Sequence, residues 1–197
     1  MPPDFKPRIP PDSRGSASRR PARESWEHLR LSDRVRPGVR VLFVGINPGI
    51  RSALTGHHFA GYSNRFWKLL HEAGLVPRPV TCDDDVCLPG WGYGVTNLVS
   101  RPSRGIDELK PADYAAARAA LVRKVRRYKP AVVALVGVTL HRALFPERRK
   151  EPIALGPQVE RLGEARVFVL PNPSGRNANF SYADMLAAFR RLRRDAP

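Results

Sequence analysis

The chain has 197 residues, a length that suits one globular domain, and its two cysteines are too few for the disulfide framework of a small secreted protein. Its formal net charge of +16, from 34 Lys and Arg against 18 Asp and Glu, favours a polyanionic partner, with nucleic acid first. No segment has the apolar length of a membrane span, and the N-terminus lacks the apolar core of a secretory signal. We therefore expect an intracellular, cytoplasmic protein with no membrane partner.

The N-terminal segment differs in composition from the rest of the chain. Residues 1–23 are rich in Pro, Arg and Ser and have almost no hydrophobic side chains, which predicts a disordered basic arm. Residues 24–197 are expected to form a single domain. Order is expected to begin near Trp26, with a short helix that includes Leu29 and Leu31.

The first regular elements are predicted between residues 39 and 91. Val39–Val44 is β-branched and nearly all apolar, which is typical of a strand buried on both faces of a parallel sheet. The strand ends in the turn at 45–49. Ser63 is expected to cap a helix over 64–73. Residues 76–91 contain three prolines and an acidic run, and are predicted to be a loop.

The second half of the chain alternates strands and helices. Strands are predicted at 94–99, 131–137, 159–162 and 167–170, and helices over 111–128, from a Thr139 cap to Phe145, and from a Ser181 cap to about Arg194. This alternation predicts an α/β fold of three layers, α/β/α, with a small central and mainly parallel sheet. Ligands of such sheets bind at the carboxyl ends of the strands.

Two turns follow apolar strands and combine Asn, Pro and Gly: GINPG at 45–49 and PNPSG at 171–175. Glycine lets the backbone approach a ligand closely, proline stiffens the loop, and an Asn side chain can orient a water or read a base edge. Such residues are also ordinary turn formers, so each turn alone is a weak signal. The two turns would share one cleft if their strands are neighbours.

The segments that carry a resemblance are GINPGIRSALTGHHFAGYSNRFWKLLHEAGL at 45–75, GVTNLVSRP at 94–102 and VLPNPSG at 169–175. With them, Pro37 to Arg191 resembles the mismatch-specific uracil/thymine DNA glycosylases of the uracil-DNA glycosylase superfamily. The resemblance implies the superfamily's three-layer fold and a monomer without metal or organic cofactor. It also implies that the enzyme flips uracil, or a related pyrimidine, out of a G·U-type mismatch in double-stranded DNA. Hydrolysis of the N-glycosidic bond would then leave an abasic site.

The resemblance assigns roles to residues around the base. Asn47 would position the hydrolytic water, and Phe59 would stack on the flipped base. The base pocket would be bordered by Ile46, Gly49, Ser52 and Asn172. An amide is no useful base at neutral pH, so we also consider that a carboxylate of the acidic run 83–85 activates the water. Asp85 is named for this role as a weaker alternative to catalysis by Asn47 alone.

The resemblance also implies a DNA-binding set. The basic surface adds Arg65 and Lys68 as phosphate contacts to this set, which the resemblance places at Asn97, Ser174, Gly175, Arg176 and Asn177. The last three would form a wedge that fills the gap left by the flipped base and contacts the opposite guanine. Here Arg176 replaces an apolar wedge residue and Asn97 replaces an expected lysine, while His57 and His58 replace less polar residues beside the aromatic position.

Two alternatives stay open at this stage. A non-catalytic module that binds mismatches or lesions would need the wedge but could dispense with Asn47. An enzyme acting on a free nucleoside or nucleotide would have little use for the positive charge, so its activity would depend weakly on salt.

Overall fold

The computed structural model describes residues 26–105, 108–148 and 150–197, so the basic arm predicted at 1–23 lies outside the described residues. Five strands form one sheet in the order β2-β1-β3-β5-β4. They are β1 (Val41–Gly45), β2 (Tyr93–Asn97), β3 (Val132–Val136), β4 (Gly156–Leu162) and β5 (Ala165–Leu170). The first three and β5 are parallel, whereas the edge strand β4 is antiparallel to β5.

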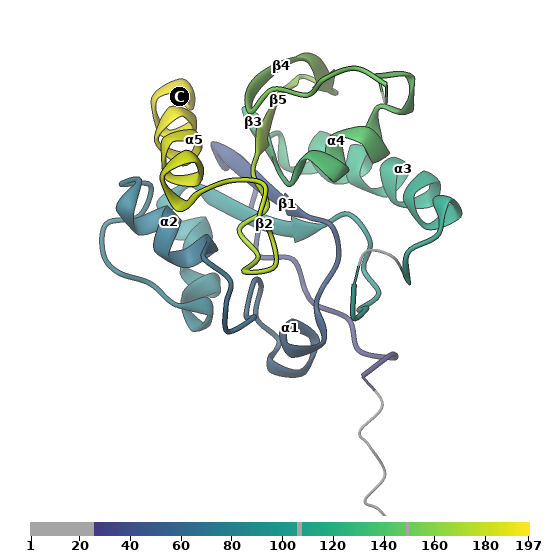
Figure 1. The fold of residues 1–197 in the computed structure, drawn as a ribbon, viewed down its shortest axis with the longest axis horizontal. Coiled ribbons are helices and arrows are strands. Elements are labelled where there is room, and N and C mark those ends of the chain that lie inside the picture. The colour runs from purple at the N-terminus through teal and green to yellow at the C-terminus, as the bar shows by residue number, and fades with distance from the viewer. Residues whose placement is uncertain (1–25, 106–107, 149) are drawn as a thin grey trace, which may run out of the picture.

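Helices cover both faces of this sheet. The helices are α1 (Ile50–Thr55), α2 (Phe66–Glu72), α3 (Pro111–Tyr128), α4 (Val138–Leu144) and α5 (Tyr182–Asp195). Figure 1 shows α2 and α5 on one side of the sheet and α3 and α4 on the other, with α1 near the end of β1. The predicted three-layer α/β fold with a mainly parallel sheet is therefore confirmed.

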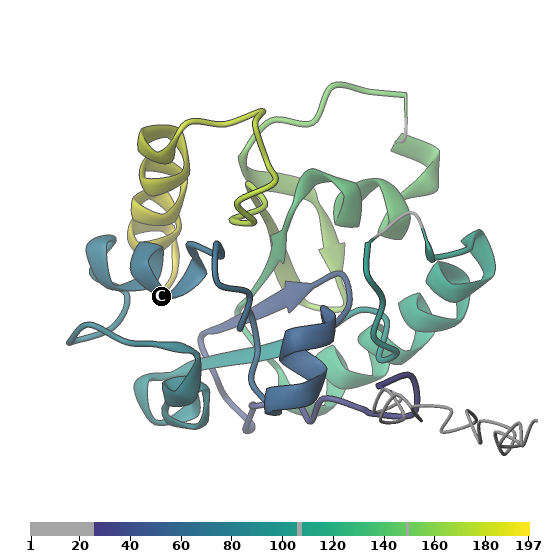
Figure 2. The same ribbon diagram turned by 60° about the horizontal axis from the view of Figure 1, so that its bottom comes forward.

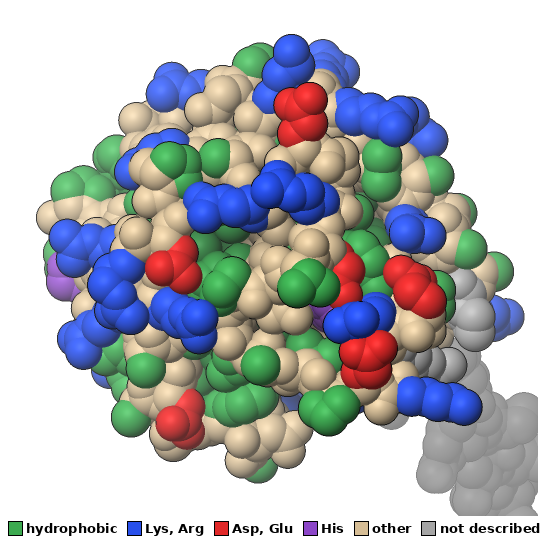
Figure 3. Space-filling model, turned by 90° about the horizontal axis from the view of Figure 1, so that it is seen from above, with side chains coloured by type: hydrophobic (Ala, Val, Ile, Leu, Met, Phe, Trp, Pro, Cys, Tyr) green, Lys and Arg blue, Asp and Glu red, His purple; other side chains and the backbone are tan. Residues whose placement is uncertain are grey.

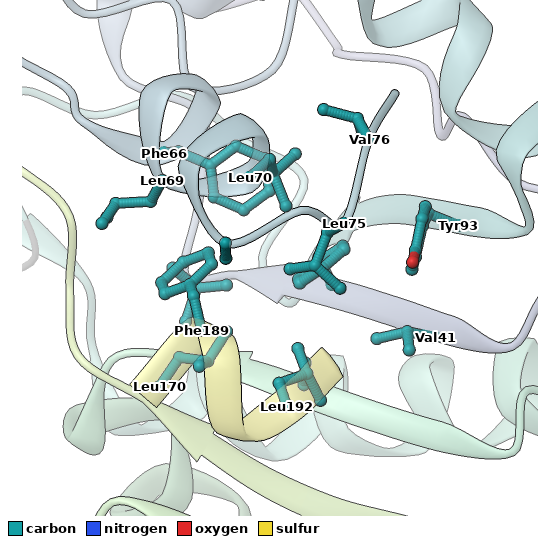
Figure 4. Close-up of a cluster of buried hydrophobic side chains, with 14 of the residues drawn as sticks. Val41, Phe66, Leu69, Leu70, Leu75, Val76, Tyr93, Leu170, Phe189 and Leu192 are labelled. Carbon is teal, nitrogen blue, oxygen red and sulfur yellow. The ribbon is translucent and has the colours of Figure 1, made fainter. Parts of the chain in front are cut away.

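The alternation of side chains along the strands explains why both faces are buried. Val41 and Phe43 point to the cluster that α2 and α5 cover, and Leu42 and Val44 point to the cluster under α3 and α4. Figure 4 shows the first cluster, where Phe189 and other side chains of α5 meet those of α2 over the sheet. Burial of each such large side chain contributes about 1.5–3 kcal/mol, so the two clusters fix the sheet between its helices.

Two predicted elements near the N-terminal half are wrong. The expected helix from Trp26 is a single turn. Arg34 pairs with Val95 of β2 in an antiparallel bridge, so the chain before Arg34 is extended instead of helical. The expected loop at 76–91 contains a 3-10 helix, η1 (Cys82–Trp91), and a second one, η3, spans Pro146–Arg148. The Asp84 carboxylate accepts the Thr81 N–H at 2.8 Å and so caps the start of η1.

Helix starts are also corrected in two places. Ser63 does not cap α2: the helix begins at Phe66, whose N–H donates to the Asn64 side chain at 3.0 Å. The helix α4 starts at Val138 directly after Gly137, so Thr139 lies inside its first turn. By contrast, Ser181 caps α5 as predicted, because its side chain accepts the Asp184 N–H.

The topology places a ligand site at the end of β1. The chain runs from β1 to β2 on one side and then crosses to β3 on the other side of β1. Connections therefore leave β1 and β3 in opposite directions, and a crevice opens at the carboxyl ends of these two strands. The two Asn-Pro turns meet there although β3 separates their strands, so neighbouring strands are not required.

Candidate active site

A cleft of about 560 Å³ opens at the carboxyl ends of the parallel strands. Its lining comes from the loop after β1 and from α1, from the segment before α2, from the end of β2, and from the loop after β5. Nine of the residues singled out in the sequence line it: Ile46, Asn47, Gly49, Ser52, Phe59, Asn97, Asn172, Ser174 and Arg176. Figure 2 shows the loop after β5 (yellow-green) beside the segment that leads into α2 (blue).

The orientation of the Asn47 amide follows from its hydrogen bonds. Its Nδ2 donates to Ser103 Oγ at 2.8 Å and to the Pro48 carbonyl at 3.1 Å. The single hydroxyl proton of Ser103 is donated to the Gly105 carbonyl at 2.6 Å, so Ser103 can only accept from Asn47. The amide nitrogen is therefore turned toward Ser103, and Oδ1 accepts no protein hydrogen bond within the described ranges. That oxygen is available to a water in the cleft.

The Phe59 ring offers only one face to a ligand. Its other face stacks on Phe66, with ring centroids 4.0 Å apart and planes inclined by 26°. Gly45 lies beneath, where a Cβ would come 3.3 Å from the Phe59 ring and 2.7 Å from Asn97 Oδ1. The glycine of the first turn is thus required by close packing against two residues of the cleft.

Phe59 has a backbone conformation that is unusual for a residue with a side chain. Its φ is 52°, in the left-handed region. This conformation costs about 1–3 kcal/mol and persists only when the surroundings fix it. Hydrogen bonds flank it on both sides: the His58 N–H donates to Asp85 at 3.0 Å, and the Ala60 N–H donates to Ser52 Oγ at 3.1 Å. Ser52 is therefore both a lining residue and a support of the aromatic segment.

The carbonyls on either side of Phe59 are bound as well. Trp67 Nε1 donates to the His58 carbonyl at 3.1 Å, and Arg51 Nε donates to the Ala60 carbonyl at 2.6 Å. Four side chains thus hold the backbone around the stacking residue.

Asp85 supports this arrangement from behind and does not line the cleft. Its side chain is fully buried. Its Oδ1 accepts from Arg34 Nε at 3.1 Å and lies 3.2 Å from His57 Nδ1, while Oδ2 accepts the His58 N–H. All these bonds point into the protein, so the geometry gives Asp85 a structural part rather than that of an activator of water.

His58 links the interior to the cleft through Asn97. The histidine is buried, and burial lowers the pKa of its imidazole, which is therefore neutral at physiological pH. Its Nε2 donates to the Ser32 carbonyl at 3.0 Å, so its Nδ1 is an acceptor and receives Asn97 Nδ2 at 3.4 Å. These hydrogen bonds turn the Asn97 Oδ1 toward Gly45 and the floor of the cleft.

The loop after β5 is fastened to the segment before α2. The Arg65 N–H donates to the Pro173 carbonyl at 3.0 Å, and its guanidinium donates to the Ser174 carbonyl at 3.0 Å. Asn177 Nδ2 donates to the Asn172 carbonyl at 2.8 Å and closes the loop on itself. Arg65 thus holds the loop in place, while Gly175 and Asn177 are not among the residues that line the cleft.

Three arginines from separate segments line the cleft: Arg51, Arg104 and Arg176. Lys68 lies away from it, beside Glu72 and the Tyr182 ring. Basic side chains also dominate the face seen in Figure 3, where Asp and Glu are fewer. Because three arginines line it, the cleft is suited to a polyanion.

Among the described residues, no group of three or more His, Cys, Asp or Glu is arranged to hold a metal ion. None of the helices in the same residues combines the length and apolar character that crossing a membrane would require.

The family comparison agrees with this geometry. The family model described as "UDG: Uracil DNA glycosylase superfamily" matches residues 32–195. This range includes the strands and helices of the described residues and every cleft-lining residue except Leu31. The chain belongs to the uracil DNA glycosylase superfamily. Membership makes the protein a DNA glycosylase, a hydrolase that acts on uracil in DNA in base excision repair.

Ser103 and Arg51 contact residues of this glycosylase's site, but the sequence did not predict either as a site residue. Ser103 follows the VSRP segment and contacts Asn47 only because the chain bridges back at Gly49. Arg51 lies in the helix α1, which was not predicted. Arg51 lies within the first resemblance segment and Ser103 directly after the second, but no local pattern in the sequence indicates their hydrogen-bond partners.

Proposed function

We propose that this glycosylase removes uracil from G·U-type mismatches in double-stranded DNA and leaves an abasic site. The base would be flipped into the cleft between Asn47 and Phe59. The observation that carries the proposal is the Asn47 oxygen, which accepts no hydrogen bond from the described residues, in a cleft that also presents one open aromatic face. A water acceptor and a stacking surface in one cleft are what hydrolysis of a flipped nucleotide needs.

In the proposed mechanism Asn47 Oδ1 accepts a hydrogen bond from the attacking water and directs its oxygen at the sugar. No carboxylate is among the described residues that line the cleft, and the proposed mechanism does without general-base catalysis, typically worth about 10²–10⁴-fold. The reaction then proceeds through a sugar with cation character and an anionic uracil. The backbone N–H groups of Ile46, Asn47 and Gly49 would stabilise that anion.

Base selection is assigned to Asn97 and Phe59. With its nitrogen engaged by His58, Asn97 presents an acceptor to the cleft floor. An acceptor there pairs with the N3–H of uracil, whereas N3 of cytosine is itself an acceptor. Stacking on the open face of Phe59 would contribute about 1–3 kcal/mol to holding either base, so discrimination rests on the amide.

Mismatch preference is assigned to Arg176. Arg176 lines the cleft and belongs to the loop that Arg65 fastens. Extrusion of a base costs a few kcal/mol and least at a mismatch. An arginine in the gap can donate to guanine O6 or N7, which favours guanine as the opposite base.

The deciding experiment measures uracil release from a duplex with one G·U pair, with A·U duplex and single-stranded DNA beside it. Asn47→Ala is expected to lose about 10²-fold or more in rate, because the water is no longer oriented. Asn179→Ala removes an exposed amide of the same type outside the cleft lining and should keep the rate. Tight binding by the wild type with no release from any substrate would instead favour a non-catalytic mismatch-binding module.

A further inference from the structure

Tyr62 is the most exposed large hydrophobic side chain of the described residues, with 90 % of its surface accessible. Its position is not on a remote surface, because its two chain neighbours, Gly61 and Ser63, both line the cleft. The ring therefore stands at the cleft mouth. Neither the hydrolytic step nor the base contacts proposed above use it.

The ring is held by a partner that is itself held. The Arg51 guanidinium lies 3.8 Å from the centroid of the Tyr62 ring. Arg51 cannot move freely, because its Nε donates to the Ala60 carbonyl at 2.6 Å. A planar cation at this distance covers one face of the ring and leaves the opposite face for another planar group.

The Tyr62 segment also touches the loop predicted to enter DNA. A Cβ on Gly175 would come 2.5 Å from the Ser63 side chain, so these two loops are in direct contact. Tyr62 and Arg176 therefore belong to two loops that touch at Ser63 and Gly175 and form one continuous rim of the cleft. The hydrogen bond from Arg65 to the Ser174 carbonyl also joins the two loops.

We propose that the exposed face of Tyr62 binds a nucleotide that flanks the flipped one on the same DNA strand. This inference rests on the proposed function. Tyr62 is three residues after Phe59, so their Cα atoms lie within about 11 Å of each other. This distance corresponds to about three base steps along one DNA strand. An aromatic ring at that distance stacks on a base or packs on its sugar regardless of sequence, while Arg51 places a cation near the adjoining phosphate.

The test measures the Kd of a duplex that holds a stable abasic-site analogue opposite guanine, which requires no base release. Tyr62→Ala is expected to raise Kd about tenfold, and Tyr62→Phe to change it by less than about twofold. A 2-aminopurine beside the abasic site should be quenched by wild type and by Tyr62→Phe but not by Tyr62→Ala. Tyr128→Ala is the matched control, because Tyr128 also has an arginine over its ring but precedes β3 at the opposite end of the sheet.

A Kd of Tyr62→Ala that equals that of the wild type would overturn the proposal. Equal losses in the Ala and Phe variants would also overturn it, since the contact would then belong to the hydroxyl. Failure of the proposed function has a different signature, which is absent uracil release by wild type. The Kd comparison decides the role of Tyr62 in either case.

Discussion

The cleft wall that carries Asn47 is fixed by neutral hydrogen bonds, whereas the wall that carries Phe59 is fixed by four side chains, one of them a buried carboxylate. Asn47 is oriented by one hydroxyl and one carbonyl, both within a short bridge between the loop after β1 and Ser103. Phe59 has a strained backbone, and its support extends through His58 to Asp85 and Arg34.

This difference follows from what each residue has to do. An amide needs only the correct end turned toward a water, and a relaxed backbone with a single donor–acceptor chain achieves that. A residue whose backbone is in the left-handed region needs stronger restraint. Hydrogen bonds to a buried carboxylate are among the strongest that a protein can form. Four predictions test this comparison, starting with the largest expected effect.

Asp85→Ala should destabilise the whole protein. The substitution leaves the Arg34 guanidinium and the His58 N–H without their buried partner, which we expect to lower the free energy of unfolding by about 3 kcal/mol. Urea unfolding measures it. Asp83→Ala, which removes an exposed carboxylate two residues earlier, is the control. If both variants unfold at the same urea concentration, the Phe59 wall does not depend on the carboxylate.

Phe59→Leu should weaken binding of a flipped base and leave binding of an abasic duplex nearly unchanged. Leucine fills part of the space but provides no aromatic face, so affinity for a duplex with a non-hydrolysable uridine analogue should fall about tenfold or more. Competition binding with both duplexes gives the comparison. Phe145→Leu, in the cluster on the far side of the sheet, controls for a general loss of packing. Equal losses on the two duplexes would argue against stacking.

Ser103→Ala should slow release of uracil without weakening binding. The main-chain bond from the Ser103 N–H to the Pro48 carbonyl is retained, so only the partner of the Asn47 amide is lost. Loss of one neutral hydrogen bond predicts a rate about tenfold lower under single-turnover conditions, and Ser103→Thr should restore it. Ser100→Ala, at an exposed position in the same loop, should have no effect. An unchanged rate in Ser103→Ala would show that Asn47 orients itself.

The smallest effect concerns pH and belongs to the Phe59 wall. Burial lowers the pKa of His58 in the folded protein, so below the unfolded value of about 6.5 the unfolded chain binds more protons. The stability contributed by neutral His58 is thus fully present above that pH and is lost progressively as pH falls below it. Urea unfolding across this window should show a shallower decline for His58→Gln than for His28→Gln, where the histidine is exposed. Parallel declines in the two variants would contradict the assignment.

The sequence predicted the sheet and the long helices because their signals are local. The apolar runs of β1 and β3 and the spacing of α3 are legible without tertiary information. The η1 helix was missed because its prolines and acidic residues suggest a loop. Its formation depends on the capping bonds between Thr81 and Asp84. Helix α1 has six residues, too few for a periodic pattern to be recognised.

The sequence predicted the residues that line the candidate site, but not the residues that hold them in place. The two Asn-Pro turns identified Asn47 and Asn172, and the resemblance identified Phe59. The parts of Ser103 and Asp85 arise from contacts between segments 56 and 27 residues apart in the chain, which no local pattern encodes. The orientation of Asn97 likewise depends on the tautomer of a histidine from another loop.

The fastening of the loop after β5 to Arg65 has a consequence for how the protein is made. Arg65 is 108 residues from Pro173 and 109 residues from Ser174 in the chain. A nascent chain emerging from the ribosome can assemble β1, β2 and the Asn47 bridge while Pro173 and Ser174 are still to be synthesised. The rim that we propose contacts DNA can therefore close only after Ser174 has left the ribosome, well after the residues of the Asn47 bridge.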